Sequence, residues 1–283
     1  MYRSTDAGNS WSQLTSPVAA DWYGVAFANR TDGWVVGDSG RIYYTNDAGD
    51  TWALQTSGTT ETLYSANCYT GLYCWAVGAN GVVVSTTNGG LTWTKQTLVS
   101  GATLDDVWFV NEDTGWVVGW LSNDEPLVYK TADGGGSWTD QSANIMAAGL
   151  TTEARGVHFL NTSSGYIVGY DSLYLTTNGG DSFIESVIGD WQRDIYAVDA
   201  TYLWAAGEWG SVDMSTDGGE SWSYAAPAGQ ESHQNRIWAM NGNEAWVVAE
   251  DGKIRHTTDA GSSWADQVTA AGVLQDIQLA HNP

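Results

Sequence analysis

The stretch Ser4-Thr5-Asp6-Ala7-Gly8-Asn9-Ser10-Trp11 decides the fold, because its pattern recurs six more times along the chain. The pattern is a hydroxyl residue, a spacer, Asp or Asn, one residue, Gly, two residues and an aromatic residue. The seven copies end at Trp11, Trp52, Trp93, Trp138, Phe183, Trp222 and Trp264. Successive copies are 39–45 residues apart, a spacing typical of solenoids, propellers and arrays.

A second motif precedes each of the last six copies. It is a short aromatic and β-branched run closed by Gly or Ala, which predicts a buried strand ending at a turn. The runs are residues 33–37, 74–78, 115–119, 165–169, 203–207 and 245–249. A further apolar strand and a polar turn precede each run, and a third strand follows it. Four antiparallel strands in about 42 residues, with no helical period, are typical of a propeller blade.

We therefore predict an all-β, seven-bladed β-propeller that forms a single domain over residues 1–283. Residues 2–4 match the close of a third strand, and residues 276–280 match a first strand. We expect the N- and C-terminal strands to share one blade, with the C-terminal strand innermost, which closes the ring. No second-strand motif exists for this blade. Either the blade is one strand short, or another segment or chain supplies the strand, or the sequence lacks a segment; an oligomer can form through this blade.

The box residues have the chemistry of structural turns. A carboxylate or amide can accept backbone N–H bonds across a tight turn, and Gly supplies the positive φ. Asn replaces Asp in two copies, and an amide cannot act as a catalytic acid. We therefore assign a structural role to the central residues of the boxes, which are Asp6, Asp47, Asn88, Asp133, Asn178, Asp217 and Asp259.

Charge and composition exclude several functions. The formal net charge is −23, from 33 acidic residues against 10 Lys and Arg. Such a field repels nucleic acid and anionic lipid headgroups. It serves either as a solubility device, for example in saline surroundings, or to steer a cationic partner. The sequence lacks the apolar run of a membrane-spanning helix and begins without a signal-peptide pattern.

Cys68 and Cys74 are the two cysteines, six residues apart on the expected strands of one hairpin. Their Cα atoms can come within disulfide range there, and a disulfide indicates an oxidising compartment. The alternative is two small hydrophobic residues. A metal site needs further ligands that do not cluster nearby. We predict no metal and no cofactor.

The box resembles that of the BNR or Asp-box repeat proteins, which include sialidases and other glycoside hydrolases. The combination of Gly-Trp-Val-Val-Gly at 33–37, a following strand and a box is most similar to the photosystem II assembly and stability factor family. This resemblance covers essentially the whole chain. It implies a seven-bladed, non-enzymatic propeller that acts in lumenal or periplasmic assembly. It leaves the partner unidentified.

Candidate binding residues lie where the first strands begin. Eleven or ten residues ahead of each second-strand aromatic residue, the expected blades present Tyr23, Tyr64, Asp105, Arg155, Arg193 and Arg236 on one rim. The resemblance implies an arginine patch near the channel, which Arg155, Arg193 and Arg236 match. Arginine binds carboxylates in a bidentate manner, so this patch can dock an acidic tail. The alternative is that the three arginines pair with Asp105, Asp106, Asp194 and Glu153.

Other aromatic residues divide into two groups. Trp22, Tyr23, Tyr64 and Trp191 lie near the same loops and can stack on sugars or anchor a protein. Trp108, His158, Tyr196 and Trp238 fall on first strands, where we expect them in the core between blades.

The leading hypothesis is a non-catalytic binding or assembly scaffold for a protein partner, located outside the cytoplasm or on a virion. One alternative is a glycoside hydrolase or carbohydrate-binding propeller, which needs two carboxyls across a cleft. Asp105, Asp106 and Asp194 are its only rim candidates, and the Phe-Arg-Ile-Pro-like motif of sialidases is missing. A further alternative is a surface component of a virion or cell appendage.

Overall fold

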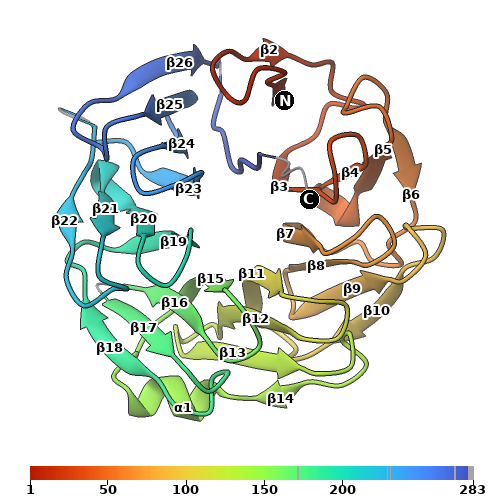
Figure 1. Ribbon diagram of the computed structural model, residues 1–283. Helices are drawn as coiled ribbons and strands as arrows, with labels where there is room; N and C mark the ends of the chain where they lie inside the picture. The colour runs from red at the N-terminus through yellow and green to blue at the C-terminus, as the bar shows by residue number, and fades with distance from the viewer. Residues whose placement is uncertain (171, 228, 230, 271, 280–283) are drawn as a thin grey trace.

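The computed structural model describes residues 1–170, 172–227, 229, 231–270 and 272–279. Six four-stranded antiparallel sheets follow one another around a central channel (Figure 1). Each sheet is one blade, and its strands run in sequence order from the channel to the outer edge. A two-stranded sheet of β1 and β2 and the C-terminal segment occupy the remaining sector of the ring.

The strands of the two-stranded sheet are β1 (Tyr2–Arg3) and β2 (Ser12–Gln13). The first three blades are β3 to β6 (Trp22–Phe27, Gly33–Gly37, Ile42–Thr45, Ala53–Gln55), β7 to β10 (Leu63–Cys68, Cys74–Gly78, Val82–Thr86, Thr94–Thr97) and β11 to β14 (Thr103–Phe109, Gly115–Trp120, Pro126–Thr131, Thr139–Asp140). The next three are β15 to β18 (Ala154–Phe159, Gly165–Gly169, Ser172–Thr176, Ile184–Val187), β19 to β22 (Gln192–Ala197, Leu203–Gly207, Val212–Ser215, Ser223–Tyr224) and β23 to β26 (Gln234–Ala239, Ala245–Ala249, Lys253–Thr257, Ala265–Thr269).

The second strand is the buried centre of every blade. In β4, β8, β16, β20 and β24 every residue is buried, as are the first five residues of β12. Their large aromatic side chains are almost inaccessible to water, Trp116 being 0% exposed and Trp75 1%. Trp116 stacks on Phe159 of the next blade with ring centroids 3.5 Å apart. Burial of such side chains is the main force that holds neighbouring blades together.

Glycine is required at both ends of the Trp-Val-Val run in β12. A Cβ on Gly115 would lie 2.5 Å from the ring of Phe109 on the preceding strand. A Cβ on Gly119 would lie 2.0 Å from the carbonyl oxygen of Thr103. These contacts explain why Gly brackets the Trp-Val-Val run, because the first and second strands pack too closely for a side chain there.

All seven boxes form the same hydrogen-bonded turn. The hydroxyl oxygen of Thr45 accepts the N–H of Gly49 at 2.8 Å, and Asp47 Oδ1 accepts the N–H of Thr51 at 2.8 Å. In the third box, Asn88 Oδ1 accepts the N–H of Thr92 at 3.0 Å. An amide oxygen thus makes the same backbone contact as a carboxylate oxygen. Hydrogen bonds to Thr51 and Thr45 hold the pKa of Asp47 at about 2.

The prediction of seven blades is wrong: the described residues form six four-stranded blades. The first box, which ends at Trp11, forms only the β1–β2 hairpin, in which Tyr2 pairs with Gln13 and Arg3 with Ser12. Residues 272–279 line the channel as expected of an inner strand, but they form no β ladder. The missing second-strand motif is the physical reason, because nothing joins the inner segment to β1. Ala280, the last residue of the predicted strand, lies outside the described residues.

The predicted disulfide is confirmed. Cys68 and Cys74 face each other at the turn end of the β7–β8 hairpin, with their Cα atoms 4.1 Å apart.

A short helix that the sequence did not reveal, α1 (Ser142–Ala147), lies between β14 and β15 and buries Ile145 against the blade. Within the described ranges, no helix is long and apolar enough to cross a membrane.

We expect reduction of the Cys68–Cys74 disulfide to lower the free energy of unfolding by about 2 kcal/mol, because the bond restricts a short loop in the unfolded chain. Urea unfolding with and without a phosphine reductant measures this change. The double variant Cys68→Ser/Cys74→Ala is the control, and its stability should not respond to the reductant. An equal response of both proteins would contradict the prediction.

Candidate partner-binding rim and channel

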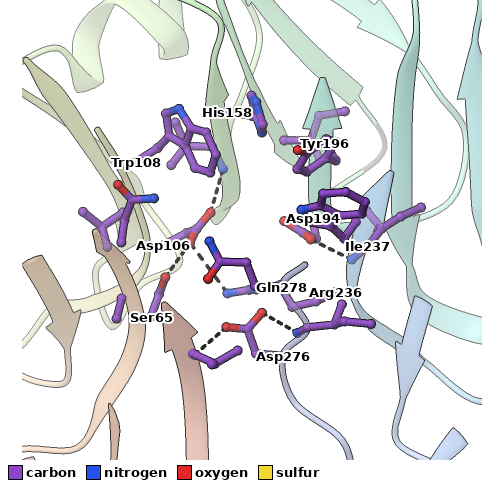
Figure 2. A pocket seen from close by; sticks show the side chains of 18 of the residues that line it. Ser65, Asp106, Trp108, His158, Asp194, Tyr196, Arg236, Ile237, Asp276 and Gln278 are labelled. Carbon is purple, nitrogen blue, oxygen red and sulfur yellow. Dashed lines mark hydrogen bonds and ion pairs between the residues drawn. The ribbon is translucent and has the colours of Figure 1, made fainter. Parts of the chain in front are cut away.

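The channel wall carries a ladder of four rings from consecutive blades. Trp108 and His158 stack with centroids 4.0 Å apart, His158 and Tyr196 are 4.7 Å apart, and Tyr196 and Trp238 are 5.4 Å apart. The sequence predicted these rings to lie in the core between blades. In the structure they also line the channel (Figure 2). Burial lowers the pKa of His158 to about 3, so its ring is neutral.

Carboxylates on the first strands tie neighbouring blades together. Asp106 accepts the N–H of Val157 at 3.0 Å, and Asp194 accepts the N–H of Ile237 at 2.8 Å. Asp276 accepts the N–H of Val25 at 2.8 Å and so joins the C-terminal segment to the first blade (Figure 2). Each bond satisfies a backbone N–H on the channel-side edge of a first strand, where no neighbouring strand can accept it.

Arg236 is the cation of this acidic group. Its guanidinium lies 3.8 Å from Asp106, and the charges of Asp194 and Asp276 also act on it. Burial raises the pKa of Asp194 to about 7 and that of Asp276 to about 6, although Arg236 opposes both shifts. The charge of Asp105 acts on Arg236 as well, so one arginine faces four carboxylates. This leaves no excess positive charge for an anionic ligand at this point.

The channel space beside these residues is small, about 190 Å³. Asp106 and Asp194 are two of the carboxylates considered for glycoside hydrolysis. Each uses an oxygen to accept a backbone hydrogen bond from the next blade. Among the described residues, no group of His, Cys, Asp and Glu has the arrangement of a metal site.

A β-bulge presents the predicted rim residues. In each blade the register of the first and second strands shifts by one residue near the start of the first strand. The residue left out of the ladder is Tyr23, Tyr64, Asp105, Arg155, Arg193 or Asn235. A bulge re-aims its side chain away from the sheet. We call this end of the ring, with the turns between second and third strands, the first-strand rim.

The predicted rim residues make contacts with one another or with near neighbours. The rings of Tyr23 and Tyr64 meet edge to face with centroids 5.6 Å apart. Burial raises the pKa of Asp105. Arg155 pairs with Glu153 and lies over the ring of Trp120 at 4.8 Å.

Arg193 also has acidic partners, Glu208 at 3.2 Å and Glu250 at 2.8 Å, and it donates a hydrogen bond to Asn235. Of the three predicted arginines, Arg155 and Arg193 are bulge residues of the rim, whereas Arg236 pairs with Val248 in the ladder and lines the channel. Each is paired with an acidic residue of this chain.

Three exposed aromatic residues on the same rim form what we call the aromatic patch: Tyr170, Trp191 and Trp209, which are 43, 37 and 54% exposed. The centroids of Tyr170 and Trp191 are 4.2 Å apart, and those of Trp191 and Trp209 are 5.5 Å apart. Of these three residues, only Trp191 was predicted from the sequence. Tyr170 and Trp209 lie in turns between second and third strands, and the available signal was an aromatic residue directly after a closing Gly or one position later.

Trp209 adopts a left-handed backbone conformation with φ of 49°. Its turn, the 3-10 helix η2 (Glu208–Gly210), matches the turn η1 (Asp38–Gly40) of the first blade, where Ser39 has φ of 57°. Left-handed φ is uncommon for a residue other than Gly. The turn therefore projects the indole outward at the same place where another blade carries a small polar residue.

The fold and its boxes define an Asp-box repeat β-propeller. The profile of the family described as photosynthesis system II assembly factor YCF48 matches residues 3–101 and 183–272, about two thirds of the chain. The chain belongs to this family. A comparison with curated protein sequences found no significant match.

Solved structures agree on the fold. A structure of YCF48 bound to D1 peptide is 17% identical, with a TM-score of 0.67 over 89% of this chain and 82% of that one. YCF48 from Cyanidioschyzon merolae is 16% identical, with a TM-score of 0.69 over 93% and 91%. The WD40 β-propeller domain of Doa1 is 12% identical, with a TM-score of 0.70 over 91% and 85%. At these identities the likeness concerns the fold alone.

We expect the stability of the ring to fall as the pH rises from about 4 to about 7. Asp194 has an ordinary pKa of 3.8 and a pKa of about 7 in the folded chain, so the folded state binds more protons across this window. The loss should amount to roughly 1–3 kcal/mol. Urea unfolding at pH 4, 5, 6, 7 and 8 measures it.

Asp194→Asn should flatten this pH dependence, because the amide stays neutral while its oxygen can still accept the N–H of Ile237. The control is Asp113→Asn, which removes the same charge at an exposed position. A slope that is unchanged in Asp194→Asn would show that Asp194 is ionised throughout the window.

Proposed function

We propose that this protein is a non-catalytic binding scaffold that presents its first-strand rim to a protein partner. The observation that carries the proposal is the aromatic patch, three exposed rings in contact on a rigid ring of sheets. Membership of an assembly-factor family supports it, as does the relative whose structure holds a D1 peptide. The partner of this chain need not be that peptide.

The patch has the features of a binding hot spot. Trp and Tyr are enriched among residues that dominate interface energies, because they bury a large area and lose little entropy. Trp209 adds a backbone conformation that is unfavourable for Trp, and such outliers gather at functional sites. Arg193 and its partners Glu208 and Glu250 lie at the edge of the patch and can supply the polar rim of an interface.

The other predicted binding residues complete the proposed surface. We propose that Tyr23, Tyr64, Asp105, Arg155 and Arg236 contribute to the same rim from the remaining blades. The net charge of −23 favours a partner segment that carries basic residues together with apolar ones. An acidic segment would have to displace the internal partners of the arginines.

We further propose that the ring catalyses no hydrolysis and acts outside the cytoplasm. The involvement of Asp106 and Asp194 in bonds between blades supports the first statement, since oxygens that a glycosidase would use already accept backbone hydrogen bonds. The Cys68–Cys74 disulfide supports the second, since such bonds persist in oxidising compartments.

We expect the double variant Trp191→Ala/Trp209→Ala to lose about tenfold or more in partner affinity, because hot-spot aromatic residues contribute about 2 kcal/mol or more. The measurement is capture of proteins from the native source on immobilised wild-type and variant rings, quantified by mass spectrometry. The control is Tyr224→Ala, which removes an exposed ring from the outer strand β22.

The variants should melt within a few degrees of the wild type, since the replaced side chains are partly exposed. A partner retained equally by all three proteins would exclude the aromatic patch as its binding site.

A further inference from the structure

The incomplete sector of the ring holds a cavity of about 910 Å³, far larger than the channel space of about 190 Å³. Its walls are the two-stranded sheet on one side and the C-terminal segment on the other, with the first and last blades beside them. We call this cavity the strand slot. Apolar side chains form much of its lining, including Trp11, Leu14, Val248, Ile254 and Ile277.

The slot lies where the six complete blades have their second strand. In each of those blades a second strand pairs with the first strand on one edge and with the third on the other. Here residues 274–279 hold the first-strand place and β1 holds the third-strand place. Within the described chain, residues 272–279 form no β ladder with β1, and β1 pairs with β2 along one edge alone. Such an edge is a template for another strand.

Arg3 marks the position of the missing aromatic residue. In two complete blades the second-strand Trp donates its indole N–H to the next blade's box, at the carbonyl of the residue between the Asp or Asn and the Gly. Trp75 donates to Gly134 O at 2.8 Å, and Trp116 donates to Gly179 O at 3.2 Å. The equivalent carbonyl facing the slot is that of Ala48. It accepts a hydrogen bond from Arg3 at 3.0 Å, and Arg3 also pairs with Asp50 at 2.8 Å.

We propose that the strand slot binds one extended segment of a different protein, which completes the seventh blade by β-augmentation. The segment has the chemistry of the six second strands: a small or apolar residue, an aromatic residue, two β-branched or alanine residues, and Gly or Ala. Backbone hydrogen bonds to both walls supply affinity, and alternate side chains fill the apolar lining. This site is separate from the aromatic patch and does not depend on the proposed function of the rim.

Charge selects the flanks of the segment. Apart from the Arg3–Asp50 pair, the charged residues that line the slot are Asp21, Asp47, Asp276 and Arg30. This excess of acidic groups favours basic residues on either side of an uncharged centre.

A second copy of this chain is a poor donor for two reasons. All six runs of the required pattern are already buried in their own blades. Two chains of net charge −23 also repel each other. The occupant that we propose is a segment of a different protein with a neutral β-strand centre and Lys or Arg flanks.

The test uses the 283-residue protein and a fluorescein-labelled peptide, Lys-Lys-Gly-Trp-Val-Val-Gly-Lys-Lys, in a fluorescence anisotropy titration. We expect saturable binding with one peptide per ring. A peptide of equal charge with Pro in place of the first Val should bind about tenfold more weakly or worse, because Pro removes a ladder donor. No saturable binding, or equal binding of both peptides, would overturn the proposal.

Two variants place the binding within the molecule. Leu14→Arg puts a charge on the apolar wall of the slot and should weaken binding about tenfold. The matched control Leu54→Arg, on the exposed outer strand β6, should bind as the wild type does. Trp191→Ala should also bind as the wild type does, so that failure of the slot and failure of the rim are distinguishable.

Cross-linking of the wild-type protein keeps the test decisive even if Leu14→Arg is unstable. A photoreactive benzoylphenylalanine replaces Trp in the peptide, and the products are mapped by mass spectrometry. The expected products are cross-links to residues 1–14, 48–52 or 272–279. Cross-links to the aromatic patch instead, or a dimer of the chain that excludes the peptide, would overturn the proposal.

Discussion

The structure depends on one constraint: a second strand must be covered on both faces and paired along both edges. Its five residues carry a large aromatic ring followed by two β-branched or alanine side chains, and water reaches almost none of them. Pairing with the first and third strands satisfies the backbone, while rings of the next blade cover the aromatic face. The channel, the rim and the outer turns are all positioned by this strand. In the sector without a second strand, β1, β2 and the C-terminal segment occupy the place of a blade but do not form a four-stranded sheet.

Much of the fold was predictable because the repeat encodes local chemistry. The box specifies its turn through its hydroxyl, its carboxylate or amide and its Gly, so every copy forms the same bonds. The disulfide followed from two cysteines at facing positions of a hairpin. The number of complete blades did not follow from the number of boxes, since a box closes a hairpin whether or not a second strand exists. Counting the second-strand motif would have given six.

The site was predictable in position more than in chemistry. The spacing from the second-strand aromatic residue picked out the bulge residues, since a bulge at a fixed register recurs in each repeat. The alternative that the arginines pair with acidic residues named Glu153 and Asp106, which are the partners of Arg155 and Arg236 in the structure. The partners of Arg193 were not predictable, because Glu208 and Glu250 come from different blades and meet only in space. Tyr170 and Trp209 escaped notice because they depart from the repeat in turns whose geometry the sequence does not specify.

The left-handed turn between the second and third strands has a consequence for how such proteins diversify. Ser39, Asn80 and Trp209 occupy equivalent positions with φ between 49° and 57°. Any residue other than Gly at this position has the same conformational free-energy cost of a left-handed backbone. The packing of the surrounding blade compensates for that cost. Exchange of one such side chain for another alters what the surface displays without refolding the turn. A family built this way can acquire new recognition by substitution at a few display positions while its ring stays constant.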